Sequence, residues 1–374
     1  MTLQRRARVW LGLAIALAGL LPGGTRAAYG ADLSRYVSSD FCGALVIHPE
    51  RINKSELAVA LKSGLSKEMT AADPVAAALA AMGKQPKKDL PPGMDVAKLA
   101  KLLDGKIVTR IVILIEPTPT ADPKVSPGII IQFGNDIDGE AILAAFSTDW
   151  KSAETHGIQY KTVKTDPGKP DFAAYVPDAR TLIAGLESTV VKMLAKDQGS
   201  QPLLKQLQNT KIDNDIILEY LAEPIWAAAA KGTSTEKALS DLGGPNAAKM
   251  AKDLKSMSIK LNFSGKTLLH AEVVTDKPEV AAQYAALAQM GIGIVKPQFQ
   301  DMKKQPPPFL PPPAVPVISK LGDEVFDGLT VKNDGPQLVV DLPMPASLPD
   351  ALKLAAQLAG AMAAPMPPKE GPTH

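Results

Sequence analysis

The sequence contains a single cysteine, Cys42, so no disulfide bond can form within the chain and the fold must depend on its apolar core. Cys42 lies beside the apolar run Ala44–Ile47. A lone cysteine in such a place is more often a small core residue than a reactive thiol, so we expect Cys42 to be buried. An exported chain without disulfides fits a bacterial periplasm or envelope better than a eukaryotic secretory route.

Histidine and aromatic residues are also scarce. The four histidines are His48, His156, His270 and His374, and none has a second histidine or cysteine at the spacing of a zinc site. His270 lies beside Lys260 and Glu272 on the polar side of an expected hairpin, where cross-strand pairing in solvent is the simplest interpretation. Aromatic residues make up 5% of the chain, which argues against a sugar-binding cleft lined by stacked rings.

The sequence lacks the common catalytic and nucleotide-binding motifs. It has no phosphate-binding loop, nucleophile-elbow serine or zinc-protease helix motif. Gly291-Ile292-Gly293 lacks the third glycine of a dinucleotide fingerprint. The segment 135–140 is rich in carboxylates like a calcium loop, but Gly139 is misplaced for an EF-hand, and a turn followed by a helix cap at Asp138 fits better. We therefore predict no catalytic, cofactor-binding or metal-binding residues.

The first 31 residues have the pattern of a secretory signal peptide. Arg5, Arg6 and Arg8 precede an apolar stretch that ends at Pro22, and small residues follow. The apolar stretch is shorter than the about 20 residues that span a bilayer. Residues 1–31 hold four Arg and no acid, so of the 41 Lys+Arg the mature chain keeps 37 against 39 Asp+Glu, a net charge of −2. No basic face is indicated, and we expect no nucleic-acid partner.

The segment after the signal carries a resemblance. Tyr36-Val37-Ser38-Ser39-Asp40 leads into an apolar strand and then His48-Pro49-Glu50-Arg51-Ile52. This order resembles the start of uncharacterised exported proteins of planctomycete-type bacteria. The resemblance implies export and a bacterial source, and it transfers no catalytic residue.

Alternating and continuous apolar patterns predict an α+β fold. We expect strands at 44–48, 107–115, 128–133, 158–164, 172–176 and 180–186, with a turn at Pro177-Asp178, and later at 215–221, 256–264, 267–275, 329–332 and 337–342. The almost wholly apolar run 107–115 predicts a central strand covered on both faces. Helices are expected at 55–65, 74–82, 96–103, 138–146, 188–195, 224–231 and 246–254.

Two further amphipathic helices are expected in the C-terminal part. After Asp276 the apolar positions Val280, Tyr284, Leu287, Gly291 and Ile294 share one face of a long helix. Apolar residues at 348, 352, 355, 359 and 362 follow helical spacing and predict a closing helix.

The order of these elements repeats, which predicts a tandem duplication of a mainly antiparallel sheet packed against helices. We place the signal peptide at 1–31, the first unit at 32–210 and the second at 211–363. A Pro-rich insertion at 305–316 is expected to be an extended connector, and 364–374 a disordered tail.

These observations favour an exported, periplasmic or cell-envelope protein that acts as a non-catalytic binding or scaffolding module. Its expected partner is an envelope protein or an apolar ligand, and no membrane span is expected after signal cleavage. Two alternatives stay open. One is a carrier that holds an apolar ligand between the sheet and the long helix, where Gln283–Ile294 is rich in small residues. The other is a hydrolase whose site is assembled from distant residues.

Overall fold

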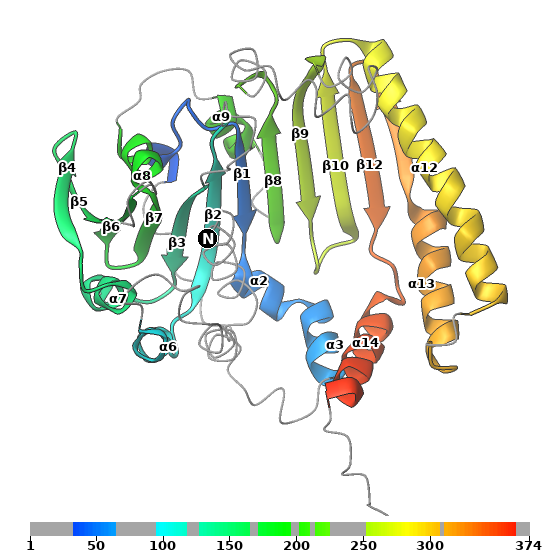
Figure 1. Cartoon of the computed structure of the whole chain (residues 1–374). Helices are drawn as coiled ribbons and strands as arrows, with labels where there is room; N and C mark the ends of the chain where they lie inside the picture. The colour runs from blue at the N-terminus through cyan, green and yellow to red at the C-terminus, as the bar shows by residue number, and fades with distance from the viewer. Residues whose placement is uncertain are drawn as a thin grey trace, which may run out of the picture.

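One antiparallel sheet organises the protein. The computed structural model describes residues 33–64, 95–117, 127–164, 171–195, 202–209, 214–224, 252–306 and 310–363. In these residues twelve strands form a sheet of order β11-β12-β10-β9-β8-β1-β2-β3-β7-β6-β5-β4, and helices surround it (Figure 1). The predicted α+β class is therefore confirmed.

The strands range from five residues in β1, β4 and β11 to nine in β10. They are β1 (Gly43–Ile47), β2 (Val108–Ile115), β3 (Pro127–Phe133), β4 (Lys151–Thr155), β5 (Ile158–Val163), β6 (Phe172–Asp178), β7 (Thr181–Leu186), β8 (Ile216–Leu221), β9 (Leu254–Leu261), β10 (Thr267–Thr275), β11 (Thr330–Asp334) and β12 (Gln337–Pro343).

Helical segments cover parts of both sides of the sheet and its lower edge in Figure 1. They are the short 3-10 helix η1 (Leu33–Tyr36) and the helices α2 (Pro49–Lys54), α3 (Glu56–Gly64), α6 (Val96–Leu103), α7 (Gly139–Phe146), α8 (Glu187–Leu194), α9 (Pro202–Asn209), α12 (Pro278–Lys304), α13 (Ala314–Gly328) and α14 (Leu348–Ala363).

The strand order repeats between the two halves. From the middle outward, β8-β9-β10-β12-β11 follows the same course as β1-β2-β3-β7-β6, and β4 and β5 extend the first course. We call β1–β7 with their helices the N-terminal half, and β8–β12 with theirs the C-terminal half. The halves join where β1 pairs with β8, for example Leu45 with Leu218. The two courses form one continuous sheet, and the tandem duplication stays a prediction; the boundary placed at 210–211 lies outside the described residues.

In the N-terminal half the sheet is covered on both faces. One apolar cluster includes Ile111, Ile113 and Ile142 and lies under α6 and α7. A second includes Leu114, Ile130 and Met193 and lies under η1, α8 and α9. Because neighbouring residues of a strand face opposite sides, β2 must be apolar almost throughout, as the sequence predicted.

In the C-terminal half the strands alternate. Leu338 and Leu342 are buried on one face of β12, and α13 approaches Leu342 where it ends at Gly328. The opposite face carries His270 paired across the strands with Lys260 and Asp341. The hairpin of β9 and β10 therefore has the predicted apolar and polar sides. Gly335, with φ 57°, lies in the turn between β11 and β12.

A helix pair connects the two halves along the lower edge of the sheet. Helix α3 follows β1, α14 follows β12, and the two pack side by side (Figure 1). A Cβ atom on Gly64 would lie 2.2 Å from the backbone oxygen of Lys353, so only glycine allows this approach. The closing helix was predicted, and its partner is the helix predicted at 55–65.

Several sequence predictions need correction. The Pro-rich segment 305–316 is not an extended connector throughout, because α12 continues to Lys304 and α13 begins at Ala314, with Pro316 in its first turn, where a missing N–H is tolerated. Helices α2, α9 and α13 and strand β4 were not predicted. Pro177 and Asp178 belong to β6, and the turn follows at Ala179-Arg180. Leu254, expected to end a helix, opens β9.

Some predictions lie outside the described residues. These are the signal peptide at 1–31, the helices at 74–82 and 224–231, most of the helix at 246–254, and the tail at 364–374.

Candidate functional site: the outer surface of helix α12

Helix α12 is the longest helix in the described part of the chain. It starts at Pro278, whose ring fits the first turn, with Glu279 beside the positive end of the helix dipole. It ends with Lys303 and Lys304 at the negative end, and Pro297 is accommodated within it. These end signals explain why the helix predicted after Asp276 forms.

The inner side of α12 packs on the C-terminal half. Ala281 and Ala285 are buried, and small side chains at these positions let the helix lie close to the sheet. Further along, Phe299 packs on α13 at Gly322, and its ring lies 5.4 Å from that of Phe326. A Cβ on Gly322 would come within 1.8 Å of the Phe299 ring, so α12 and α13 depend on glycine here.

The outer side of α12 exposes large apolar side chains. Leu287, Met290, Ile294 and Val295 retain 49%, 56%, 54% and 50% of their accessible surface, and we call these four residues the α12 patch. The helix has no charged residue from Val280 to Val295. Contiguous apolar surface of this kind marks a binding site more often than scattered single side chains do.

The α12 patch corrects a prediction made from the sequence. The stripe from Val280 to Ile294 was expected to be one packed face of the helix. Val280 is buried and Tyr284 is half-buried, but Leu287, Gly291 and Ile294 are exposed. The inward positions are instead Ala281, Ala285 and the half-buried Ile292, because small residues allow closer packing than the stripe does. The long uncharged run was the signal that could have revealed the patch.

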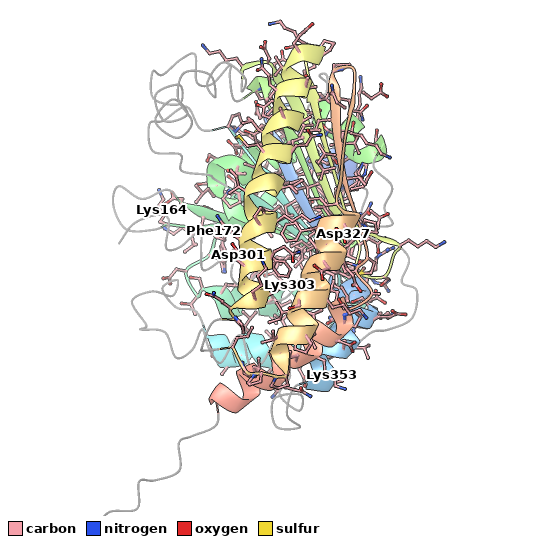
Figure 2. All side chains as sticks on the ribbon, turned by 90° about the vertical axis from the view of Figure 1, so that its right-hand side faces the viewer. Lys164, Phe172, Asp301, Lys303, Asp327 and Lys353 are labelled. Carbon is pink, nitrogen blue, oxygen red and sulfur yellow. The ribbon has the colours of Figure 1, made fainter. Side chains whose placement is uncertain are left out.

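The charged side chains at the C-terminal end of the patch form ion pairs with α13. Lys296 pairs with Asp327 of α13 at 2.9 Å, and Lys303 with Asp323 at 2.7 Å. Figure 2 shows Asp301 and Lys303 near the end of α12 and Asp327 on α13. The hydrogen bond from Lys303 lowers the pKa of Asp323 below its usual value. The apolar surface therefore borders a band of neutralised charge that fixes α12 against α13.

On the apolar side of the C-terminal half the sheet is only half-buried. Met257, Ile259, Ala271 and Val273 are all partly exposed, and they occupy paired positions on β9 and β10. Tyr284 of α12 is half-buried, and burial raises the pKa of its hydroxyl. The space that the carrier alternative requires would lie along this layer.

The structure shows what the titratable side chains of the N-terminal half do. Cys42 is 1% exposed with its Sγ 3.3 Å from the Ile115 carbonyl, and burial raises its thiol pKa to about 11. The thiol is therefore protonated near neutral pH and is a poor nucleophile. The buried Glu116 is neutralised by Lys192 at 2.6 Å. These groups act as parts of the core.

A cluster of polar side chains lies where the two halves meet. The Asp215 carboxylate is fully buried and accepts hydrogen bonds from Arg51 Nε, at 3.0 Å, and from the Phe263 backbone. His48 is 5% exposed, and its Nε2 has no hydrogen-bond partner in the described part of the chain. Burial, with Arg110 and Arg51 nearby, lowers the pKa of His48 to about 4.

His270 pairs with a carboxylate on the polar side of the C-terminal half. Its Nδ1 lies 2.7 Å from Asp341 Oδ1, and both side chains are about one-third exposed. The sequence placed His270 beside Lys260 and Glu272; the structure adds Asp341 from β12 as its partner. An oriented imidazole is one part of a hydrolytic site. The Thr330 hydroxyl, opposite Asp341 on β11, donates to the Asp341 backbone carbonyl at 3.4 Å.

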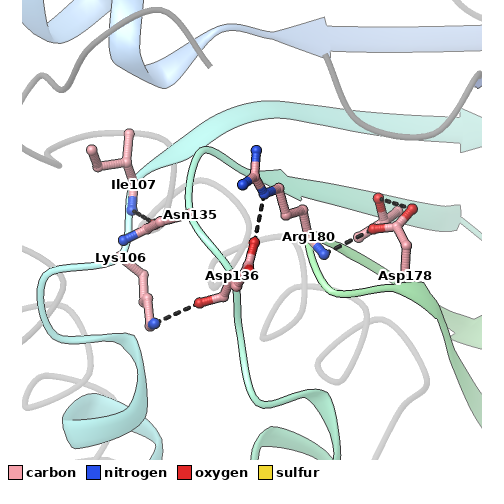
Figure 3. A network of polar contacts seen from close by, with 7 residues as sticks. Lys106, Ile107, Asn135, Asp136, Asp178 and Arg180 are labelled. Carbon is pink, nitrogen blue, oxygen red and sulfur yellow. Dashed lines mark hydrogen bonds and ion pairs between the residues drawn. The ribbon is translucent and has the colours of Figure 1, made fainter. Parts of the chain in front are cut away.

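The polar groups of the acidic turn after β3 stabilise the local structure (Figure 3). Asp138 caps α7 by accepting a hydrogen bond from the Ala141 backbone at 2.9 Å, as predicted. Asp136 pairs with Arg180 Nε at 2.7 Å, and its backbone oxygen accepts from Lys106. Asn135 accepts from the Ile107 backbone. The turn thus joins β2, β3 and β7 with its own polar groups.

Two further observations concern metal binding and membrane spans in the described residues. No group of three or more His, Cys, Asp or Glu side chains there is arranged to hold a metal ion. Within the same ranges, no helix combines the length and the apolar character that a bilayer crossing requires.

Comparison with known proteins gives little further information. No family model matches the sequence, and no curated protein matches it. Among solved structures the chain is similar to one described as "Structure of crystal form I of TP0453", with a TM-score of 0.36 and 9% sequence identity, over 88% of this chain and 99% of that one. A likeness this distant leaves the function to be argued from the chain itself.

Proposed function

We propose that this chain is an exported, non-catalytic binding module of the bacterial cell envelope, and that the α12 patch binds an apolar partner. The observation that carries the proposal is the exposure of Leu287, Met290, Ile294 and Val295 on a helix segment without charge. The signal-peptide pattern at the N-terminus and the resemblance to exported planctomycete-type proteins support the compartment.

The size of the patch favours lipid hydrocarbon over a folded protein as the partner. The uncharged segment 280–295 spans about 24 Å of helix and is about 10 Å wide, so it offers a footprint of roughly 240 Å². A stable protein interface buries about 800 Å² on each partner. Fluid hydrocarbon needs no such area and no complementary shape, because each apolar side chain that it covers contributes independently.

The expected affinity is modest. Covering the remaining half of one Leu, Ile, Met or Val side chain contributes about 1 kcal/mol, so the four residues together contribute about 4 kcal/mol. Lys304, 76% exposed near the end of the helix, can reach the headgroup region.

Sedimentation with vesicles of neutral phosphatidylcholine tests this proposal. We expect the double variant M290N/I294N to bind about 30-fold more weakly than the natural chain, since it loses about 2 kcal/mol. V59N/L61N is the matched control, because Val59 and Leu61 of α3 are exposed to 58% and 37% but lie outside the patch. Equal binding by all three proteins, or no binding by the natural chain, would contradict the proposal.

A carrier of a single apolar ligand is the second candidate. The observation in its favour is the half-buried apolar layer of Met257, Ile259 and Val273 on β9 and β10. Native mass spectrometry of protein purified from cells should then show a co-purifying lipid that the variant Ala271→Trp, which fills the layer, no longer retains. A mass equal to the bare chain in both proteins would remove this candidate.

A further inference from the structure

The polar group at the lower end of the β1–β8 seam has a buried imidazole at its centre. The seam is the pairing of β1 with β8, which joins the two halves into one sheet. At its end the His48 backbone N–H donates to the Asp215 carbonyl at 2.8 Å. His48 also begins α2, whose first hydrogen bond runs from Ile52 to the His48 carbonyl at 3.1 Å. One residue therefore connects the seam to the helices α2 and α3.

Two guanidinium groups lie near His48, that of Arg51 on α2 and that of Arg110 on β2, and both lower its pKa. Because Ile47 pairs with Ile111, the next residues along, His48 and Arg110, are neighbours across the two strands. Asp215, which precedes β8, accepts hydrogen bonds from Arg51 and the Phe263 backbone. A protonated His48 would thus be a third positive charge near two guanidinium groups.

A second proton on the His48 imidazole would be unfavourable in the folded protein. Its Nε2 is buried and has no hydrogen-bond partner among the described residues, so an N–H there would be an unsatisfied donor that carries charge. The other side of the ring interacts with the Thr109 backbone. The folded arrangement therefore accepts only the neutral form of His48, whereas an opened seam lets water solvate the charged form.

We propose that this group, His48 with Arg51, Arg110 and Asp215, is an acid-sensitive joint between the two halves of the protein. Protonation of His48 separates the end of β1 from the start of β8 and releases α2 from the sheet, while the core under α6, α7 and α8 stays folded. The joint is independent of the α12 patch, so it goes beyond the proposed binding function and either can fail alone.

The direction of the pH effect follows from linkage. An unfolded or opened chain has His48 with a pKa near 6.5, and the folded joint has it near 4. The open form binds more protons between these values, so the joint weakens as the pH falls below about 6.5 and the loss levels off below about 4. Between pH 7 and pH 5 the population of the open joint should rise about 20-fold.

Hydrogen exchange of the full chain at pH 7 and pH 5, corrected for the intrinsic pH dependence, tests the joint. We expect the amides of His48 and of β8 to exchange about 20-fold faster at pH 5 after correction. The variant His48→Gln should abolish this rise, because glutamine keeps a polar side chain but does not titrate. His270→Gln, the matched control on the exposed polar side, should keep it.

Three results would overturn the proposal: seam amides that are insensitive to pH in the natural chain, a rise of the same size in His48→Gln, or seam exchange that depends on low urea as steeply as that of β2 and β3. The last would show global unfolding rather than a joint, because local opening exposes little surface. If His48→Gln does not fold, an NMR titration of the natural chain replaces it. An imidazole of His48 that titrates near pH 6.5 would then contradict the account.

Discussion

The N-terminal half is covered by helices on both faces of its sheet, whereas the helices described in the C-terminal half lie on one face. Ile130 and Ile183 are completely buried in the first, and their surroundings are apolar on every side. In the second, Ile259 and Val340 are only half-buried although the strand order is the same. The same topology thus supports a closed core in one half and an accessible apolar surface in the other.

The difference arises from the course of the chain after each outer strand. After β7 the chain folds back as α8 over the sheet, where Val190 and Met193 are buried. After β12 the corresponding helix α14 instead packs against α3 of the other half. His270 and Asp341 can be polar because α14 does not pack on their side of the sheet. The C-terminal half therefore has a helix that connects the halves rather than one that closes its own layer.

The largest expected effect is on the core of the N-terminal half. Ile130→Ala should lower the free energy of unfolding by about 4 kcal/mol, because it leaves a cavity in a site that is 0% exposed. Ile259→Ala, at a half-buried site of the C-terminal half, should cost about 1 kcal/mol. Urea unfolding measures both, and equal losses would show that the two halves are packed alike.

Cys42 provides a second test of the closed half. Its thiol pKa, raised to about 11 from 9, means about 100-fold less thiolate at neutral pH, and burial slows access further. A maleimide should therefore label the native chain at least about 100-fold more slowly than the chain in denaturant. Labelling at the denatured rate would mean that the core around Cys42 opens readily.

The next effect distinguishes the two helices of the C-terminal half. Gly322→Ala should destabilise the protein by about 2 kcal/mol, because the new methyl group meets the Phe299 ring. Gly293→Ala is the matched control, since a Cβ there has open space and alanine favours a helix by about 1 kcal/mol. Thermal unfolding should shift down for the first and up for the second; a stable Gly322→Ala would place α13 away from α12.

The smallest effect is expected on the polar side of the C-terminal half. His270→Gln should change the free energy of unfolding by less than about 1 kcal/mol, because the pair with Asp341 is solvent-exposed and screened. Urea unfolding in low and high salt measures the change. A loss of several kcal/mol would show that this side is covered and that the halves resemble each other more than we describe.

Local sequence patterns predicted most elements of the sheet. The apolar run of β2, the alternating hairpin of β9 and β10 and the cap at Asp138 are each decided by residues near one another in the chain. The periodicity of α12 predicted its existence but not its orientation, because alanine at 281, 285 and 288 packs closer than the larger stripe does. A helical pattern reports which residues share a face and not which face meets the sheet.

The polar joint could not be predicted in the same way. His48, Arg110 and Asp215 are far apart in the sequence and meet only because β1 is placed between β2 and β8. His270 and Asp341 meet for the same reason, because β10 and β12 pair although two helices separate them in the sequence. Helix α13 was missed because its proline-containing start favoured an extended connector, although proline is well tolerated in a first turn.

Hydrogen exchange of the full chain with and without phosphatidylcholine vesicles tests most directly the claim that one half is a closed scaffold and the other a binding surface. Without vesicles, β2 and β3 should be the most protected segments and α12 should exchange much faster. Vesicles should slow exchange in residues 287–295 and leave β2 and β3 unchanged. Protection that appears elsewhere in the chain, or nowhere, would contradict the account.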